Sequence, residues 1–119
     1  MASKLKNGTS NACNIQILHK SCEVNETLRN ISPRWKMQIL HSIKQGTNQF
    51  SLLKLAFPSI SDQILAKRLS ELMVDELVDK TTIQDTVPQQ ITYTTTKKGE
   101  ELLKIINDLH QWEISWQIL

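Results

Sequence analysis

Residues 60–80 read ISDQILAKRLSELMVDELVDK, and residues 91–103 read ITYTTTKKGEELL. The first stretch has the apolar period of an α-helix, and past Glu76 the period changes to the two residues of a strand. The second stretch continues that alternation before a new helical pattern begins at Thr96. A helix that leads into a two-stranded hairpin is typical of a winged helix-turn-helix. These residues therefore predict an α+β fold, mainly α with one small β-hairpin.

The helix that precedes the hairpin has a clear beginning. Ser61 is a suitable N-cap, because its hydroxyl can accept a hydrogen bond from a backbone N–H of the first turn. Upstream, Phe50 and Leu53 predict a shorter helix that ends before Pro58, since helical backbone is disfavoured before a proline. The short connection predicts a helix-turn-helix. The apolar face of the second helix is expected to contain Ile64, Leu65, Leu69, Leu72 and Met73.

Two more helices are predicted on the N-terminal side. One begins after about Cys22, and the pair Ser32 and Pro33 marks the start of the next, because proline is favoured at the first helical position. Gly46 is expected to close that helix. Residues 1–14 are polar and lack periodicity, which predicts a flexible tail, and we assign residues 15–119 to one DNA-binding domain with dimerisation helices at both ends.

The last segment predicts a hairpin and a long helix. Strands are expected from about Leu77 to Ile83 and over residues 91–95, with Pro88 in the exposed connection. Thr96 can cap a final helix of about 30 Å if it continues to Gln117. So long an apolar face exceeds what a small core can cover, and a second copy of the chain is the simplest partner. The residues expected at this homodimer interface are Leu28, Leu102, Ile105, Ile106, Leu109, Trp112 and Trp116.

Composition sets further limits. The chain has 119 residues, of which 39% are hydrophobic and 22% charged, which suits one domain with a single core. The net charge of +2 is only mildly basic, and residues 49–119 carry seven basic against ten acidic side chains. No membrane span or signal-peptide core is evident, so we expect a cytoplasmic protein. Two cysteines without a CxxC motif argue against a structural metal site, and no metal or cofactor is expected.

The winged-helix interpretation assigns roles to polar residues. At the start of the second helix, Ser61, Asp62 and Gln63 are positioned to meet base edges, and Lys67 or Arg68 can reach guanine or phosphate. For each residue alone, an ordinary solvated surface is the competing interpretation. The further candidates for contact with the DNA backbone are Ser51, Lys54, Arg34 and Lys36 and, on the wing, Lys80, Gln84, Gln89 and Gln90.

The order of these segments resembles the HxlR-type family of bacterial winged-helix transcriptional regulators, within the MarR-like superfamily. The resemblance covers roughly residues 22–116 and implies a DNA-binding regulator. The matching stretches are Cys22 at the start of the first helix, SPRWKMQIL, QFSLLKLAFPSIS, ILAKRLSELMVDELV and VPQQITYTTTKKGEELL.

The chain departs from the family pattern at several positions. Glu23 replaces a proline, and Ser32 and Pro33 replace a pair of glycines. The glycine expected before Leu77 and Val78 is Glu76, and basic residues are replaced by Gln49 and Gln89. Two positive charges that could meet phosphate are therefore absent. This predicts either modest and strongly salt-sensitive affinity for DNA, or that the remaining contacts suffice.

Cys22 is the candidate for regulation by thiol chemistry. A helix N-terminus favours a thiolate, and the resemblance implies a sensor cysteine at this position. The neighbouring Glu23 and Glu26 act against a thiolate, and an unpaired cysteine is commonly just a small apolar residue. Cys13 is the candidate partner of an oxidised Cys22. An electrophile or another small molecule is therefore a candidate effector.

The sequence favours a homodimeric DNA-binding regulator of transcription that binds a palindromic operator. A repressor is favoured over an activator. Two other classes compete with it. The acidic C-terminal half favours a winged-helix module that binds protein and not DNA. A thiol oxidoreductase that uses Cys22 and Cys13 is the third class, but the sequence shows no CxxC motif or phosphate loop, so we do not expect an enzyme.

Overall fold

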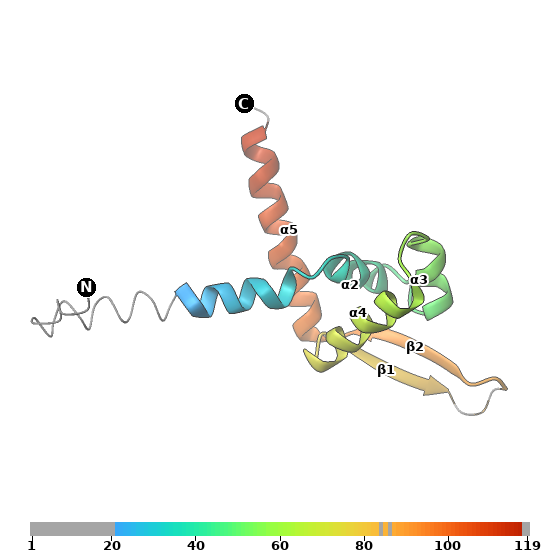
Figure 1. Ribbon diagram of the computed structural model, residues 1–119. Coiled ribbons are helices and arrows are strands. Elements are labelled where there is room, and N and C mark those ends of the chain that lie inside the picture. The colour runs from blue at the N-terminus through green and yellow to red at the C-terminus, as the bar shows by residue number, and fades with distance from the viewer. Residues whose placement is uncertain (1–20, 84, 86, 118–119) are drawn as a thin grey trace, which may run out of the picture. The chain divides into compact units, whose positions relative to one another are not determined.

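The computed structural model describes residues 21–83, 85 and 87–117, and the chain divides into two compact units, Met1–Pro33 and Arg34–Leu119. In the first unit, residues 21–31 are helical (Figure 1). Val24 and Leu28 lie four residues apart on this helix and are about half exposed. The tail expected over residues 1–14 lies outside the described residues.

The second unit is a winged helix-turn-helix followed by a long helix, as the sequence predicts (Figure 1). Two antiparallel strands form the wing, and the helix after them is the longest element. Among the described residues, no helix is both long and apolar enough to cross a membrane. The elements are α2 (Lys36–Lys44), α3 (Phe50–Ala56), α4 (Asp62–Val74), β1 (Val78–Ile83), β2 (Gln90–Thr95) and α5 (Lys97–Gln117).

Helix α2 begins later than the Ser32 and Pro33 pair predicts. Trp35 precedes the helix with φ of 76°, in the left-handed region that a bulky side chain rarely adopts. Its ring packs edge-on against Phe57, with 6.1 Å between the ring centroids. This packing offsets part of the strain at Trp35. Gly46, with φ of 107°, follows the end of α2 as expected.

The turn between α3 and α4 is held by local hydrogen bonds. The N–H of Ile60 donates to the carbonyl of Phe57 (3.1 Å), and the hydroxyl of Ser61 accepts from the N–H of Ile64 (3.2 Å). The second bond confirms Ser61 as the N-cap of α4. Both helices turn their apolar sides to one core. Its fully buried members are Ile39, Leu40, Leu53, Leu65, Leu69, Leu72 and Val78.

The wing is attached to this core through one residue of each strand, Val78 of β1 and Tyr93 of β2. Lys80 pairs with Tyr93 in the antiparallel register, and the N–H of Tyr93 donates to the carbonyl of Asn48 at 2.9 Å. Burial raises the pKa of the Tyr93 phenol above its ordinary value of 10.0. The base of the hairpin is therefore fixed against the segment that joins α2 to α3, while its far end is exposed.

The exit of α4 meets the start of α5 at a compact junction. Glu76 takes a φ of 62°, although the family pattern has glycine there, so this chain keeps the left-handed turn with a side chain that disfavours it. The Thr96 hydroxyl donates to the carbonyl of Glu76 (2.7 Å) and accepts from the N–H of Gly99 (3.0 Å). The second bond confirms Thr96 as the cap of α5.

Gly99 is required at this junction because a methyl group there would collide with the backbone carbonyl of Leu77. We expect Gly99→Ala to lower the free energy of unfolding by about 1–3 kcal/mol, although alanine is the better helix former. Chemical denaturation of both proteins measures the difference. Lys97→Ala, at an exposed position of the same helical turn, is the control and should change stability by less than about 0.5 kcal/mol. Equal stability of Gly99→Ala and the parent would contradict this close approach.

Candidate nucleic-acid interface

Helix α4 has one buried and one exposed side. Leu65, Leu69 and Leu72 are at most 2% exposed and pack into the core. The opposite side is exposed along the whole helix and ends at Val74, which is 77% exposed. This outer face of α4 consists of Gln63, Ala66, Lys67, Ser70 and Val74. It combines an amide, an ammonium and a hydroxyl with two apolar groups, which are the chemical types that read base edges in a major groove.

The N-terminal end of α4 is tied to α3. The ammonium of Lys54 lies 3.0 Å from the carboxylate of Asp62 and also donates to the carbonyl of Ile60. Asp62 remains largely exposed, and a carboxylate in the first turn stabilises the helix. The positive charge of Lys54 is thus partly neutralised within the protein. Ser61 and Gln63 are exposed beside this pair.

The sequence predicted that Arg68 reaches guanine or phosphate, but in the structure its guanidinium is engaged within the protein. Its Nε donates to the carbonyl of Arg34 at 2.7 Å, and its NH1 donates to both carboxylate oxygens of Glu71 at 3.1 and 3.2 Å. The side chain is only 13% exposed. Arg68 therefore joins the middle of α4 to the segment before α2, and it does not belong to the outer face that could read DNA.

Lys36 was expected at a phosphate, but the structure buries it. Its side chain is 3% exposed, and its Nζ lies 2.6 Å from Oδ2 of Asp75, the residue that caps α4. The carbonyl of Asp75 also accepts a hydrogen bond from Lys98 at 2.7 Å. The correction has a simple cause: Lys36 lies one turn before Leu40, on the side of α2 that faces the core.

The wing carries few positive charges. Lys80, Gln89 and Gln90 are exposed, as a contact with the DNA backbone requires, whereas Gln84 lies outside the described residues. Asp79 and Asp85 are exposed on the same hairpin and oppose a strong attraction to phosphate.

Two other candidates for phosphate contact are accessible. Ser51 is exposed in the first turn of α3. Arg34 is exposed, and its guanidinium carbon lies 4.9 Å from the centre of the Trp35 ring. Stacking on an aromatic ring leaves the edge of a guanidinium open to hydrogen bonding, so Arg34 stays a predicted phosphate contact.

Helix α5 presents an apolar stripe. Ile105, Leu109, Trp112 and Trp116 are each 56–65% exposed. Leu102 is instead partly buried against the core of its own protomer. Four large apolar side chains at helical spacing on one exposed face are typical of a surface that another chain covers. The remaining α5 member of the expected interface, Ile106, is half-buried and lines a cavity beside α2.

The candidate thiol site is only partly described. Cys22 lies in the helical residues 21–31 and is an exposed free cysteine, while Cys13 lies outside the described residues. Exposure is the first condition for reaction with an oxidant or an electrophile. Within the described ranges, no group of three or more His, Cys, Asp or Glu side chains is arranged to hold a metal ion.

The model of the HxlR-like helix-turn-helix family matches residues 30–118. The chain belongs to this family. The matched region contains the whole winged helix-turn-helix and α5, so α3 and α4 are the helix-turn-helix for which the family is named.

Similar proteins are regulators of transcription. YodB, an HTH-type transcriptional regulator of Bacillus subtilis (strain 168), is 32% identical over 82 residues, which are 69% of this chain and 72% of YodB. Its diamide-treated crystal structure superposes with a TM-score of 0.69 at 27% identity, over 78% of this chain and 91% of that chain.

Two further solved structures share the fold. A transcriptional regulator of the MarR family from Enterococcus faecalis V583 has a TM-score of 0.75 and 28% identity, over 82% of this chain and 88% of that one. The redox regulator HypR in its reduced form has a TM-score of 0.70 and 28% identity, over 78% of this chain and 91% of that one.

The sequence interpretation missed two members of the outer face of α4, Ala66 and Val74. Counting three, four, seven and eleven residues from Gln63 along a helix gives positions 66, 67, 70 and 74, so helical periodicity alone contains this signal. Ala66 and Val74 matter because apolar contact with the thymine methyl group is a recognised form of base readout.

The buried pair gives a prediction that separates a structural lysine from a phosphate contact. Lys36→Ala leaves Asp75 without its partner, and we expect a loss of about 1–3 kcal/mol in the free energy of unfolding, because Asp75 remains about one-third exposed. Urea denaturation measures this loss. Under conditions in which the variant stays folded, its DNA affinity should fall with salt at the same slope as that of the parent. If Lys36→Ala instead has unchanged stability and its DNA affinity depends less steeply on salt, Lys36 contacts phosphate.

Proposed function

We propose that the protein is a homodimeric repressor of transcription that inserts α4 of each protomer into the major groove of a two-fold symmetric operator. The observation that carries this proposal is the exposed outer face of α4, which lies between a capped N-terminal turn and a wing. Family membership supports the same conclusion. A dimer bound across a promoter represses by occupying DNA that the transcription machinery needs.

The outer face of α4 supplies the groups for base readout. Gln63 can form a bidentate pair with adenine near the helix N-terminus, and Lys67, one turn later, can donate to guanine. Ser70 adds a hydroxyl that donates or accepts. Ala66 and Val74 offer apolar contact to thymine methyl groups. The wing follows α4 in the chain and can reach the DNA backbone with Lys80 and two exposed glutamines.

Charge determines how binding depends on salt. Lys54 is paired with Asp62, Lys36 with Asp75, and Arg68 with Glu71, so three of the predicted cations are partly or wholly neutralised. Lys67 and Lys80 remain exposed on α4 and the wing. Few counterions are then released per protomer, and base contacts supply a larger share of the affinity.

Substitutions on α4 test the assignment by fluorescence anisotropy with operator DNA selected from random sequence. Gln63→Ala should weaken binding to the selected operator by about 1–3 kcal/mol per half-site and relax the base preference at one position. Lys67→Ala should weaken binding and reduce the salt slope by about one unit per half-site.

Glu101→Gln, an exposed substitution on α5, is the control and should leave affinity within twofold. If neither α4 variant differs from this control, α4 is not the reading helix. Failure of the parent to retain any duplex at low salt, together with a stable protein partner, would favour the competing function, a winged-helix module that binds protein.

The proposed dimer uses α5. Ile105, Leu109, Trp112 and Trp116 form a continuous exposed stripe that a second copy could cover by the same residues around a two-fold axis. Leu28, half exposed on the helix of the first unit, is a further candidate for this interface. A two-fold dimer presents two α4 helices to half-sites about 34–36 Å apart, one turn of DNA.

The stripe predicts a change of oligomeric state. Trp116→Ala should raise the dimer dissociation constant by about tenfold or more, because truncation of a large aromatic anchor commonly costs more than 1 kcal/mol. Sedimentation velocity across a range of concentrations measures the shift. Gln111→Ala, an exposed residue of the same helix outside the stripe, is the matched control. A stable monomer of the parent at micromolar concentration would contradict the dimer.

We also propose that reaction at the Cys22 thiol modulates DNA binding. The support is the exposure of Cys22 together with the similarity to YodB, known in a diamide-treated form, and to the redox regulator HypR. Oxidation by diamide joins two thiols in a disulfide while the diazene takes up two electrons and two protons. The second thiol comes from Cys13, from another copy of Cys22, or from an added low-molecular-weight thiol.

Thiol variants distinguish the role of Cys22 from that of Cys13. Diamide should change the DNA affinity of the parent severalfold, with reversal by dithiothreitol, and should have no effect on Cys22→Ser. Anisotropy titrations before and after treatment give both affinities. The variant Cys13→Ser identifies the second thiol, because it abolishes the response only if Cys13 supplies that thiol. A response of equal size in Cys22→Ser would leave Cys22 without a regulatory role.

A further inference from the structure

Three consecutive carbonyl groups at the exit of α4 accept hydrogen bonds from the start of α5. The side-chain ammonium of Lys98 donates to the carbonyl of Asp75 at 2.7 Å. Thr96 supplies the other two donors: its hydroxyl donates to the carbonyl of Glu76 at 2.7 Å, and its backbone N–H donates to that of Leu77 at 3.0 Å. The end of the proposed reading helix is therefore bound directly to the helix that carries the proposed dimer surface.

These two segments, residues 75–77 and residues 96–100, form what we call the α4–α5 joint, and their backbones are in contact. A Cβ at Gly99 would collide with the carbonyl of Leu77, so no side chain separates the two segments there. Three hydrogen bonds and a direct backbone contact leave little freedom in the angle between α4 and α5.

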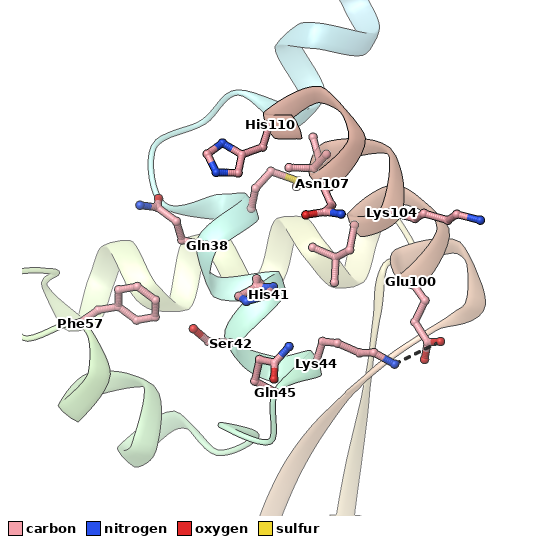
Figure 2. A pocket seen from close by; sticks show the side chains of 13 residues that line it. Gln38, His41, Ser42, Lys44, Gln45, Phe57, Glu100, Lys104, Asn107 and His110 are labelled. Carbon is pink, nitrogen blue, oxygen red and sulfur yellow. Dashed lines mark ion pairs between the residues drawn. The ribbon is translucent and has the colours of Figure 1, made fainter. Parts of the chain in front are cut away.

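Helix α2 holds the joint from both sides. Its last residue, Lys44, lies 3.4 Å from the carboxylate of Glu100 (Figure 2). Its first residue, Lys36, forms the buried ion pair with Asp75. Both carboxylates belong to the joint, so α2 holds the end of α4 and the start of α5 together.

Helix α5 connects this joint to the proposed dimer axis. It continues from Lys97 to Gln117 as one helix, and the exposed stripe lies within residues 105–116 (Figure 1). At about 1.5 Å per residue, the middle of the stripe is about 17 Å from Gly99. The position of α4 relative to a two-fold axis through the stripe therefore depends on the angle at the joint.

A small change of that angle is large on the scale of DNA. Gln63 precedes Asp75 by twelve residues, which is about 18 Å along α4. A rotation of about 10° at the joint moves Gln63 by about 3 Å, close to the rise of about 3.4 Å per base pair. In a dimer, such a rotation shifts each α4 by about one base pair.

We propose that the α4–α5 joint sets the number of base pairs between the two half-sites, with Thr96 as its positioning residue. This inference rests on the proposed function, in which α4 reads each half-site of a two-fold operator. Thr96 holds the joint because one hydroxyl both donates to the carbonyl of Glu76 and accepts from the N–H of Gly99. The outer face of α4 then selects the bases of a half-site, and the joint selects the separation of the half-sites.

Operators of altered spacing test the joint. The selected half-sites are placed in duplexes whose spacer is changed by up to two base pairs in either direction. Fluorescence anisotropy gives each affinity at a temperature where circular dichroism shows every variant folded. The parent should lose about tenfold in affinity or more for each change of one base pair.

Two substitutions at Thr96 separate its hydroxyl from its bulk. Thr96→Val removes the hydroxyl at similar volume, and it should reduce the spacing penalty by about threefold or more, or move the optimum by about one base pair. Thr96→Ser keeps the hydroxyl and should retain the profile of the parent.

A second pair of variants acts from the surface. Lys98→Met removes the bond to the carbonyl of Asp75 from an exposed position, and it should change the spacing profile in the same direction by about twofold or more. Lys97→Met, the same charge change at the neighbouring exposed residue, is the matched control and should leave the profile unchanged.

The outcomes separate the joint from the proposed function. A parent that binds no duplex, or that tolerates every spacer, would overturn both. A parent that discriminates between spacers, beside Thr96→Val and Lys98→Met variants of the same profile, would overturn the joint alone. An equal loss of affinity on every duplex would show that Thr96 acts only through stability, which also overturns its positioning role.

Discussion

The ion pair between Lys36 and Asp75 is the constraint on which the position of α4 depends. With 2.6 Å between Nζ and Oδ2 and a lysine that is 3% exposed, it joins the first residue of α2 to the last turn of α4. A buried ammonium is costly without a partner, so any arrangement that separates these helices is strongly disfavoured. Arg68 adds a second tie at the middle of α4, through the carbonyl of Arg34. The outer face of α4 is presented to solvent at a fixed angle because both ties lie on its other side.

This arrangement is accompanied by backbone strain at its two ends. Trp35, just before α2, and Glu76, just after α4, both take positive φ values that side chains other than glycine disfavour. Each is compensated locally, Trp35 by packing on Phe57 and Glu76 by the hydrogen bond from Thr96. The chain thus keeps both turns, including the one after α4, where Glu76 stands in place of the family's glycine.

Much of this could be predicted from local sequence, because caps and periodicity are short-range signals. Ser61 and Thr96 cap their helices as expected, and the hairpin occupies the expected residues. The long-range partners of Lys36 and Arg68, which are Asp75 and the carbonyl of Arg34, could not be predicted in this way. They lie 39 and 34 residues away, and residue type alone does not distinguish a lysine that meets phosphate from one that meets a buried carboxylate. The burial of Lys36 could be predicted from the sequence, since Lys36 shares a helical face with Leu40 and Ile43.

Amide chemical-shift mapping of the ¹⁵N-labelled protein with a short DNA duplex tests the central claim most directly. The account predicts that the largest shifts on addition of DNA fall on the outer face of α4, at Gln63, Lys67 and Ser70, and on the wing near Lys80. The amides of α5 beside Trp112 should change little. Shifts confined to α5 or to the helical residues 21–31, with α4 unperturbed, would contradict the assignment of α4 as the helix that reads DNA.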